Sequence, residues 1–250
     1  MNILCLQLDT KWEDPGANRE KIGRMVSAAP RAPGDLVVLP ELCLTGFTMN
    51  SGFAESAGGE SERFFSDIAA GSKVFILAGL AVKTEHGIAN QAVIFDPDGI
   101  VQSRYDKIHQ FTPSGEHEHY CRGEQVVVAG IGGMQAAPMI CYDLRFPETF
   151  RQAVSKGAGL FVVIANWPAA RSGHWRALLA ARAIENQAFV AGVNRVGSDP
   201  ENEYAGDSVV FDPKGELVES AGNSECVMGI AIDPALTEQW RSEFPAVKDR

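Results

Sequence analysis

The turn motif IFDPDG at residues 94–99 returns as VFDPKG at residues 210–215, and each copy follows a similar succession of segments. A repeat of about a hundred residues is far longer than a solenoid unit, so it predicts two similar halves of one domain. Two mixed sheets that stack face to face, with helices outside, would give an α/β fold of the four-layer αββα sandwich type. No low-complexity segment or Ser/Gly linker interrupts the chain, so we expect residues 1–250 to form a single domain.

Both halves alternate β-branched apolar runs with helix-length amphipathic segments and end in a hairpin. In the first half we expect strands at 2–8, 35–41, 74–82, 91–96 and 100–107, and helices at 18–29 and 61–70. In the second half we expect strands at 159–168, 189–197, 207–212 and 216–220, and a helix at 174–187. The runs at 35–41 and 159–168 are apolar almost throughout, which is typical of strands covered on both faces.

Charge and cysteine content restrict the partners and the compartment. The net charge of -10 argues against binding to nucleic-acid phosphates or to an anionic membrane surface. No apolar run approaches the ~20 residues that span a bilayer, and the first ten residues lack the basic and small-residue features of a signal peptide. The five cysteines are odd in number and form no C-x-x-C pair, which predicts reduced thiols in the cytoplasm.

Polar residues stand where three apolar runs stop. Glu41 ends LVVLPE, Asn166 ends FVVIAN and Cys141 ends APMIC. Ligands of open α/β sheets bind outside the carboxyl ends of the strands, so we expect these three side chains to face one cleft.

Several chemistries have no motif in this chain. G-x-S-x-G, G-x-G-x-x-G and G-x-x-x-x-G-K-[ST] are all absent, so neither a serine hydrolase elbow nor a nucleotide site is indicated. The segment HEHYC, with His117, Glu118, His119 and Cys121 near His109, could ligate zinc. It lacks H-E-x-x-H and a second ligand pair, so we interpret it as a polar surface loop and expect no metal.

Cys141 allows two interpretations from the residues alone. Free cysteine is often a small buried hydrophobe. However, Cys141 comes just before a turn and a helix that starts near Pro147, where backbone N–H groups favour a thiolate and can hold an oxyanion.

Glu41 and Lys107 also have an ordinary and a catalytic interpretation. A carboxylate after a buried strand is usually a structural ion pair, although apolar surroundings suit a general base. Lys107, after a hairpin strand, is either an exposed lysine or a cation that stabilises a thiolate and an oxyanion.

Three segments resemble the signature motifs of the nitrilase superfamily, the carbon–nitrogen hydrolases: LPELCLTGF at 39–47, YDKIHQF at 105–111 and ICYDLRFPE at 140–148. They occur in the family's order and the resemblance covers essentially the whole chain. It implies the αββα fold and a catalytic triad of Glu41, Lys107 and Cys141. Glu116, in SGEHEHY, matches the family's additional glutamate.

The resemblance implies a thioester mechanism that needs no cofactor. Cys141 would attack an amide carbonyl while Glu41 accepts its proton, and Lys107 with the backbone N–H of Tyr142 would hold the oxyanion. Glu41 would then protonate the departing ammonia. A water activated by Glu41 and positioned with Glu116 would hydrolyse the thioester.

Within the superfamily the chain is most similar to the ω-amidase branch, which implies a small 2-oxo acid amide such as 2-oxoglutaramate or 2-oxosuccinamate. Arginine is the natural partner of the distal carboxylate of such a substrate. Four arginines are candidates by position: Arg145, Arg171, Arg176 and Arg195. Asn166 also belongs to the predicted site, and Phe47, Trp167 and Tyr142 are candidates for the wall of the pocket.

Other hypotheses remain open at this point. The nearest is another amide or ureide hydrolase of the family, for example an N-carbamoyl amino acid hydrolase, followed by a nitrile-hydrolysing enzyme. A catalytically silent interaction protein is the alternative from a different class. The resemblance also implies a homodimer formed through the segments at 146–157 and 175–187.

Overall fold

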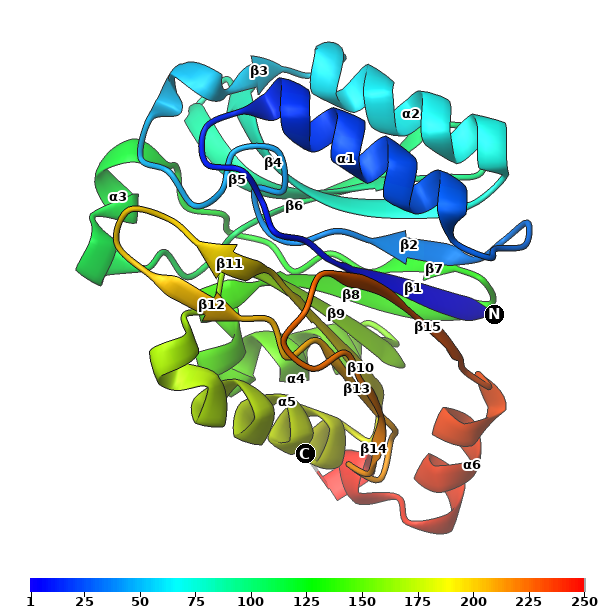
Figure 1. Cartoon of the computed structure of the whole chain (residues 1–250). Coiled ribbons are helices and arrows are strands. Elements are labelled where there is room, and N and C mark those ends of the chain that lie inside the picture. The colour runs from blue at the N-terminus through cyan, green and yellow to red at the C-terminus, as the bar shows by residue number, and fades with distance from the viewer. Residues whose placement is uncertain (250) are drawn as a thin grey trace.

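The computed structural model describes residues 1–249 and contains two stacked β-sheets with helices on both outer faces (Figure 1). α1 (Pro15–Ala28) and α2 (Glu60–Ser72) cover the first sheet. α4 (Pro147–Ser155) and α5 (Ser172–Asn186) cover the second sheet. The chain therefore has the four layers of an αββα sandwich.

The two sheets repeat one strand order. The first sheet runs β15 (Cys226–Ala231), β1 (Asn2–Gln7), β2 (Leu36–Val38), β4 (Phe75–Thr84), β5 (Gly87–Phe95) and β6 (Val101–Asp106), with β3 (Glu55–Ser56) beside β4. The second runs β7 (Ala129–Ile131), β8 (Met134–Ile140), β9 (Leu160–Ala165), β10 (Phe189–Asn194), β13 (Val209–Phe211) and β14 (Leu217–Ser220). In each sheet three parallel strands are followed by two antiparallel ones. This correspondence is the internal duplication that the repeated turn motif predicts.

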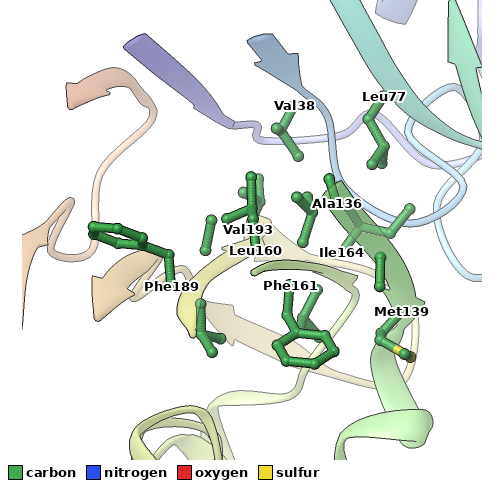
Figure 2. Packing of buried hydrophobic residues seen from close by; sticks show 14 of the residues in the cluster. Val38, Leu77, Ala136, Met139, Leu160, Phe161, Ile164, Phe189 and Val193 are labelled. Atoms are coloured by element: carbon green, nitrogen blue, oxygen red, sulfur yellow. The ribbon is translucent and has the colours of Figure 1, made fainter. Parts of the chain in front are cut away.

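The core between the sheets follows from side-chain alternation along the strands. Figure 2 shows Val38 and Leu77 of the first sheet facing Ala136 and Ile164 of the second. Phe161, the neighbour of Leu160 on β9, points the other way and packs against Phe150 of α4, with ring centroids 4.9 Å apart. Both faces of β9 are therefore buried, which explains why its sequence is apolar without interruption.

Element boundaries differ from the sequence-based expectation where capping and turns intervene. Helix α1 begins at Pro15 rather than at residue 18, because Asp14 caps it and proline suits its first position. Strand β2 ends at Val38, earlier than predicted, since the chain turns through Pro40 and Glu41 away from the sheet. Gly79 on β4 makes this turn possible: a Cβ there would lie 2.5 Å from the Cα of Glu41.

One edge of the sandwich collects the segments that leave the parallel strands. The antiparallel hairpin of β11 (Val196–Ser198) and β12 (Glu203–Ala205) and the short helix α3 (Glu116–His119) lie at this edge (Figure 1). At the other end of the chain, α6 (Ala235–Glu243) follows β15. No helix among residues 1–249 is long and apolar enough to cross a membrane.

Candidate active site

Two carboxylates and an ammonium meet beneath this edge. The Lys107 Nζ, directly after β6, donates to Glu41 Oε1 at 2.7 Å and to the two oxygens of Glu116 at 3.0 and 2.9 Å. All three side chains are at most 1% exposed. Burial alone would lower the pKa of Lys107, but the carboxylates of Glu116 and Glu41 outweigh it and raise that pKa, so the amine stays an ammonium.

Asparagines orient the two carboxylates. The Asn90 Nδ2 donates to Glu41 Oε1 at 2.8 Å and to Glu116 Oε1 at 2.9 Å. The Asn166 backbone N–H donates to Glu41 Oε2 at 2.9 Å, and its Nδ2 donates to the Glu41 carbonyl at 2.7 Å. The backbone N–H of Phe111 completes the set by donating to Glu116 Oε2 at 2.6 Å. These contacts leave the Glu41 carboxylate little rotational freedom.

Cys141 stands at the end of β8, where the chain turns into a 3₁₀ helix over Cys141–Arg145. Its φ of 47° lies in the left-handed region, which is strained for a side chain with a Cβ and is characteristic of functional turns. The sulfur lies 3.9 Å from the carbonyl of Asn166. The side chain is partly exposed and lines a cavity, so the thiol is accessible rather than enclosed in the core.

The cavity has a volume of about 470 Å³ and is lined by Cys141, whose thiol interacts with the charges of Glu41, Lys107 and Glu116. Its walls come from both halves of the chain. Among the residues that line it are Trp12, Phe47, Phe111, Cys141, Tyr142, Arg145, Asn166, Trp167, Arg171 and Tyr204. The Lys107 Nζ lies 5.1 Å from the ring centre of Phe47. The wall thus combines aromatic faces with two cations, and the acidic residues Glu13, Asp199 and Glu201 also line it.

The family model for carbon–nitrogen hydrolases matches residues 3–242. The chain belongs to the carbon–nitrogen hydrolase family. It is 38% identical to the omega-amidase YafV of Escherichia coli K12, with 100% of this chain and 96% of that protein aligned. It is 34% identical to the 2-oxoglutaramate amidase of Bacillus subtilis 168, over 99% and 96% of the two chains.

A solved structure agrees with this assignment. A CN-hydrolase superfamily protein from Xanthomonas campestris, with an arsenic adduct in its active site, superposes on this chain with a TM-score of 0.94. The two are 36% identical, and the alignment covers 100% of this chain and 97% of that one. The protein is thus a hydrolase of carbon–nitrogen bonds with the αββα fold, as the sequence motifs predict.

In this carbon–nitrogen hydrolase the resting protonation state of Cys141 differs from the sequence-based expectation. Backbone N–H groups at the turn were expected to favour the thiolate of Cys141. The pKa of Cys141 is instead raised, first by burial and then by the negative charge of Glu41, which outweigh the opposing effect of Lys107. Cys141 therefore rests as a thiol and needs a base to accept its proton.

Two of the four candidate arginines lie outside the cavity lining. Arg195 is fully buried and donates to the carbonyls of Thr10 and Ser198 at 2.9 and 3.0 Å. Arg176 binds the carboxylate of Asp207, with its Nε donating at 2.5 Å. Their cationic groups are committed to the fold, so the expectation that either receives a substrate carboxylate is wrong.

Arg145 and Arg171 line the cavity. Arg145 stacks on Trp167 at 4.8 Å, and Arg171 lies 5.6 Å from the ring centre of Phe111. Within residues 1–249 neither guanidinium has a carboxylate within 4.0 Å. Both cations are therefore free to meet an anion.

The histidine-bearing segment is a surface feature. His117 and His119 are exposed on α3, whereas the Cys121 thiol contacts the carbonyl of His86 at 2.7 Å. Across the described chain, no group of three His, Cys, Asp or Glu side chains is arranged to hold a metal ion.

Two buried polar residues of the site received no role in the sequence analysis: Asn90 stands outside the three motifs, and Asp143 stands inside the segment ICYDLRFPE. Asn90 joins Glu41 to Glu116, and Asp143 lies under the turn that carries Cys141. A signal for Asn90 was present: the pair Asn90–Gln91 interrupts an otherwise apolar strand, and a buried polar residue needs a partner.

Proposed function

We propose that the protein is an ω-amidase: it cleaves the terminal amide of a small 2-oxo acid amide, such as 2-oxoglutaramate or 2-oxosuccinamate, to the dicarboxylate and ammonia. One observation carries the proposal. A thiol that lines a cavity lies beside a buried carboxylate–ammonium–carboxylate cluster, and two arginines without a carboxylate partner in the described chain line the same cavity. The full-length similarity to enzymes named omega-amidase and 2-oxoglutaramate amidase supports it.

Glu41 is the general base for the attack of Cys141. The thiol passes its proton to the Glu41 carboxylate as sulfur bonds to the amide carbon, and the carbonyl oxygen becomes an oxyanion. Collapse of this intermediate breaks the C–N bond, and Glu41 returns the proton so that ammonia leaves. The product on the enzyme is a thioester of Cys141. Since the resting thiol is protonated, an immobilised base next to it is indispensable.

Lys107 and the backbone N–H of Tyr142 stabilise the oxyanion in both halves of the reaction. Water then attacks the thioester carbon, giving one proton to Glu41, which passes it to the leaving sulfur. Glu116 accepts from the Lys107 ammonium together with Glu41 and helps to position the water. Fixed by Asn90 and Asn166, the cluster has the preorganisation that this chemistry needs.

Arg145 and Arg171 receive the distal carboxylate of the substrate. An arginine fork binds a carboxylate through two parallel hydrogen bonds, and the aromatic faces under both guanidinium groups restrict where these groups can move. Phe47 and Trp167 wall the space between the arginines and the thiol. A substrate with a carboxylate at one end and an amide at the other matches a cavity that has arginines in its wall and a reactive thiol.

A substrate panel tests the proposal. Purified protein is incubated with 2-oxoglutaramate, 2-oxosuccinamate, N-carbamoyl-β-alanine and a simple aliphatic nitrile, and ammonia release is measured beside a Cys141→Ala control. We expect the highest kcat/KM with the 2-oxo acid amides and no turnover by the variant. Preference for the carbamoyl compound or the nitrile would assign another activity of the family, and silence on the whole panel would favour an interaction protein. Full activity of Cys141→Ala would refute the thioester mechanism.

We further propose that residues 1–250 act as one domain, that the protein works in the cytoplasm and that it forms a homodimer through α4 and α5. The interior between the sheets includes residues of both halves, which supports the single domain. The homodimer is proposed from the resemblance to the family, and α5 adds one exposed apolar side chain, Ile184, which is 56% exposed. Static light scattering tests the dimer: a monomer mass at micromolar concentration would contradict it.

A further inference from the structure

Asp143 is a fully buried carboxylate, two residues after Cys141, that has no part in the chemistry described above. Four donors surround it. Its Oδ2 accepts from the Tyr105 hydroxyl at 2.7 Å and from the Ile140 backbone N–H at 3.0 Å. Its Oδ1 accepts from the backbone N–H of His109 and from the His109 Nδ1, both at 2.9 Å. Moving a charge out of water into the protein interior costs free energy, which only well-placed hydrogen-bond partners offset.

These donors come from the two segments whose reactive side chains must meet. Tyr105 and His109 stand two residues before and two residues after Lys107. Ile140 directly precedes Cys141 in the chain. The Asp143 carboxylate therefore joins the Lys107 segment, residues 105–109, to the turn that carries Cys141.

The link is stiff on both sides. The His109 ring stacks on Phe146 with a centroid separation of 3.8 Å and an interplanar angle of 6°, which fixes the position of its Nδ1. Burial, and then the Asp143 charge, raise the pKa of Tyr105, so its hydroxyl remains a donor. On the other side, the bond from Ile140 closes a short loop around Cys141 and stabilises its positive φ.

We propose that Asp143 is a positioning residue: through its four hydrogen bonds it sets the separation between the Lys107 ammonium and the Cys141 sulfur. This inference rests on the roles assigned to those two residues in the proposed function. A misplacement of about 1 Å between reacting groups costs ~10²-fold in rate, so a rigid tie between segments distant in sequence has a direct catalytic value.

Asp143→Asn tests whether this carboxylate joins the two segments. The amide that replaces it carries two hydrogens of its own, and these face N–H and O–H groups whose hydrogen bonds the carboxylate accepted. Active sites are counted by mass spectrometry of Cys141 alkylated with iodoacetamide. We expect kcat per active site to fall about 10²-fold with KM little changed. The alkylation rate constant should fall about tenfold, because the cation that stabilises the thiolate has moved away from the sulfur.

The chain offers a matched control in Asp35→Asn. Asp35 is a buried carboxylate that directly precedes β2, whereas Glu41 follows the other end of that strand. It accepts from the backbone and side chain of Asn2 and from the Ala32 N–H. The Asp35→Asn variant should have a lower melting temperature, as Asp143→Asn does. Its kcat per active site and its alkylation rate should stay at the wild-type values. Equal kcat and alkylation losses in the two variants, or none in Asp143→Asn, would overturn the proposal.

Tyr105→Phe keeps the inference testable if Asp143→Asn does not fold, because it removes one bond of four. Its kcat should fall about tenfold, the lower end of the effect of one hydrogen bond to a charged group, with a parallel decrease in Cys141 alkylation. Wild-type values of both would refute the tie. Alkylation needs no amide substrate, so a protein that hydrolyses nothing on the panel would refute the proposed function while the positioning role is still measured.

Discussion

The surroundings of Cys141 disfavour the ionised form of its thiol. The negative charge of Glu41 is one cause, and a single substitution can remove it. Glu41→Gln deletes a negative charge beside the thiol while Lys107 keeps its partner Glu116. The pKa of Cys141 should therefore fall, and alkylation by iodoacetamide at a fixed pH between 7 and 9 should become faster. Amide hydrolysis should decrease by ~10³-fold or more, because no general base remains.

Opposite responses of alkylation and turnover would separate the base function of Glu41 from a purely structural one. The alkylation rate is followed across pH at the Cys141 peptide, so that the partly exposed Cys121 and Cys226 do not contribute. Slower alkylation of Glu41→Gln at every pH would contradict the electrostatic argument.

Arginine substitutions test how the cavity recognises an anion. Arg171→Met keeps an unbranched apolar stem and removes the guanidinium with its charge, so KM for 2-oxoglutaramate should rise ~10–100-fold, as expected when a charged hydrogen bond is lost. Arg145→Met should behave similarly. Arg176→Met is the control on the adjoining helix, since that guanidinium binds Asp207 outside the cavity lining, and its KM should stay that of wild type. An unchanged KM in both cavity variants would exclude these arginines as the carboxylate receptor.

Residue-scale inference from sequence depended on short motifs. Glu41, Lys107 and Cys141 stand in segments with a recognisable order, so their proximity could be expected before any coordinates. The choice among four arginines could not, because a guanidinium reaches far from its Cα, and Arg195 and Arg176 turn to partners that sequence spacing does not reveal. The role of Asp143 is hidden for the same reason: its partners His109 and Tyr105 are 34 and 38 positions away in the chain.

At the scale of elements, the close approach of β4 to the segment after β2 positions Glu41. A Cβ on Gly79 would lie 2.5 to 2.7 Å from backbone atoms of residues 40–42. Gly79→Ala should therefore push this segment outward, costing about 1–3 kcal/mol of stability and lowering kcat at least tenfold. Urea unfolding and initial-rate kinetics measure the two effects.

Gly229→Ala is the matched control in the same sheet. Gly229 lies on β15, and nothing stands within 4 Å of where its Cβ would be. Replacing this strand glycine should leave kcat unchanged and raise stability slightly. Wild-type kcat in Gly79→Ala would show that Glu41 is not held by this contact.

Most elements were predictable because hydrophobic period and turn residues act locally. The first and last residues of the elements were less predictable, since they depend on capping by Asp14 at α1 and on the turn at Pro40 after β2. The short hairpin of β11 and β12 was not expected as a separate sheet. Its residues are polar at the tip and Asp199 organises them by accepting from the N–H groups of Glu201 and Asn202, a local feature with no periodic signal.

At the scale of the whole molecule, the duplicated halves share one interior, and the site draws on both. Glu41 and Lys107 come from the first half, and Cys141 and Asn166 come from the second. The cluster of buried residues between the sheets includes side chains of β1, β2, β4, β5, β8, β9 and β10. The site therefore exists only while the two sheets are packed together, and loss of activity should coincide with loss of the fold.

Leu160→Ala examines this coupling. Leu160 is fully buried at the start of β9, far along the strand from Asn166, and its removal should cost about 2–5 kcal/mol. Activity, far-UV circular dichroism and tryptophan fluorescence should be lost together in urea, at a lower midpoint than in wild type, with kcat in buffer unchanged. Leu217→Ala, on β14 and 50% exposed, controls for the leucine side chain and should change the free energy of unfolding by less than ~0.5 kcal/mol. Activity lost at a lower urea concentration than the circular dichroism signal would show that the sheets separate before they unfold, and that the shared interior does not make the two halves one cooperative unit.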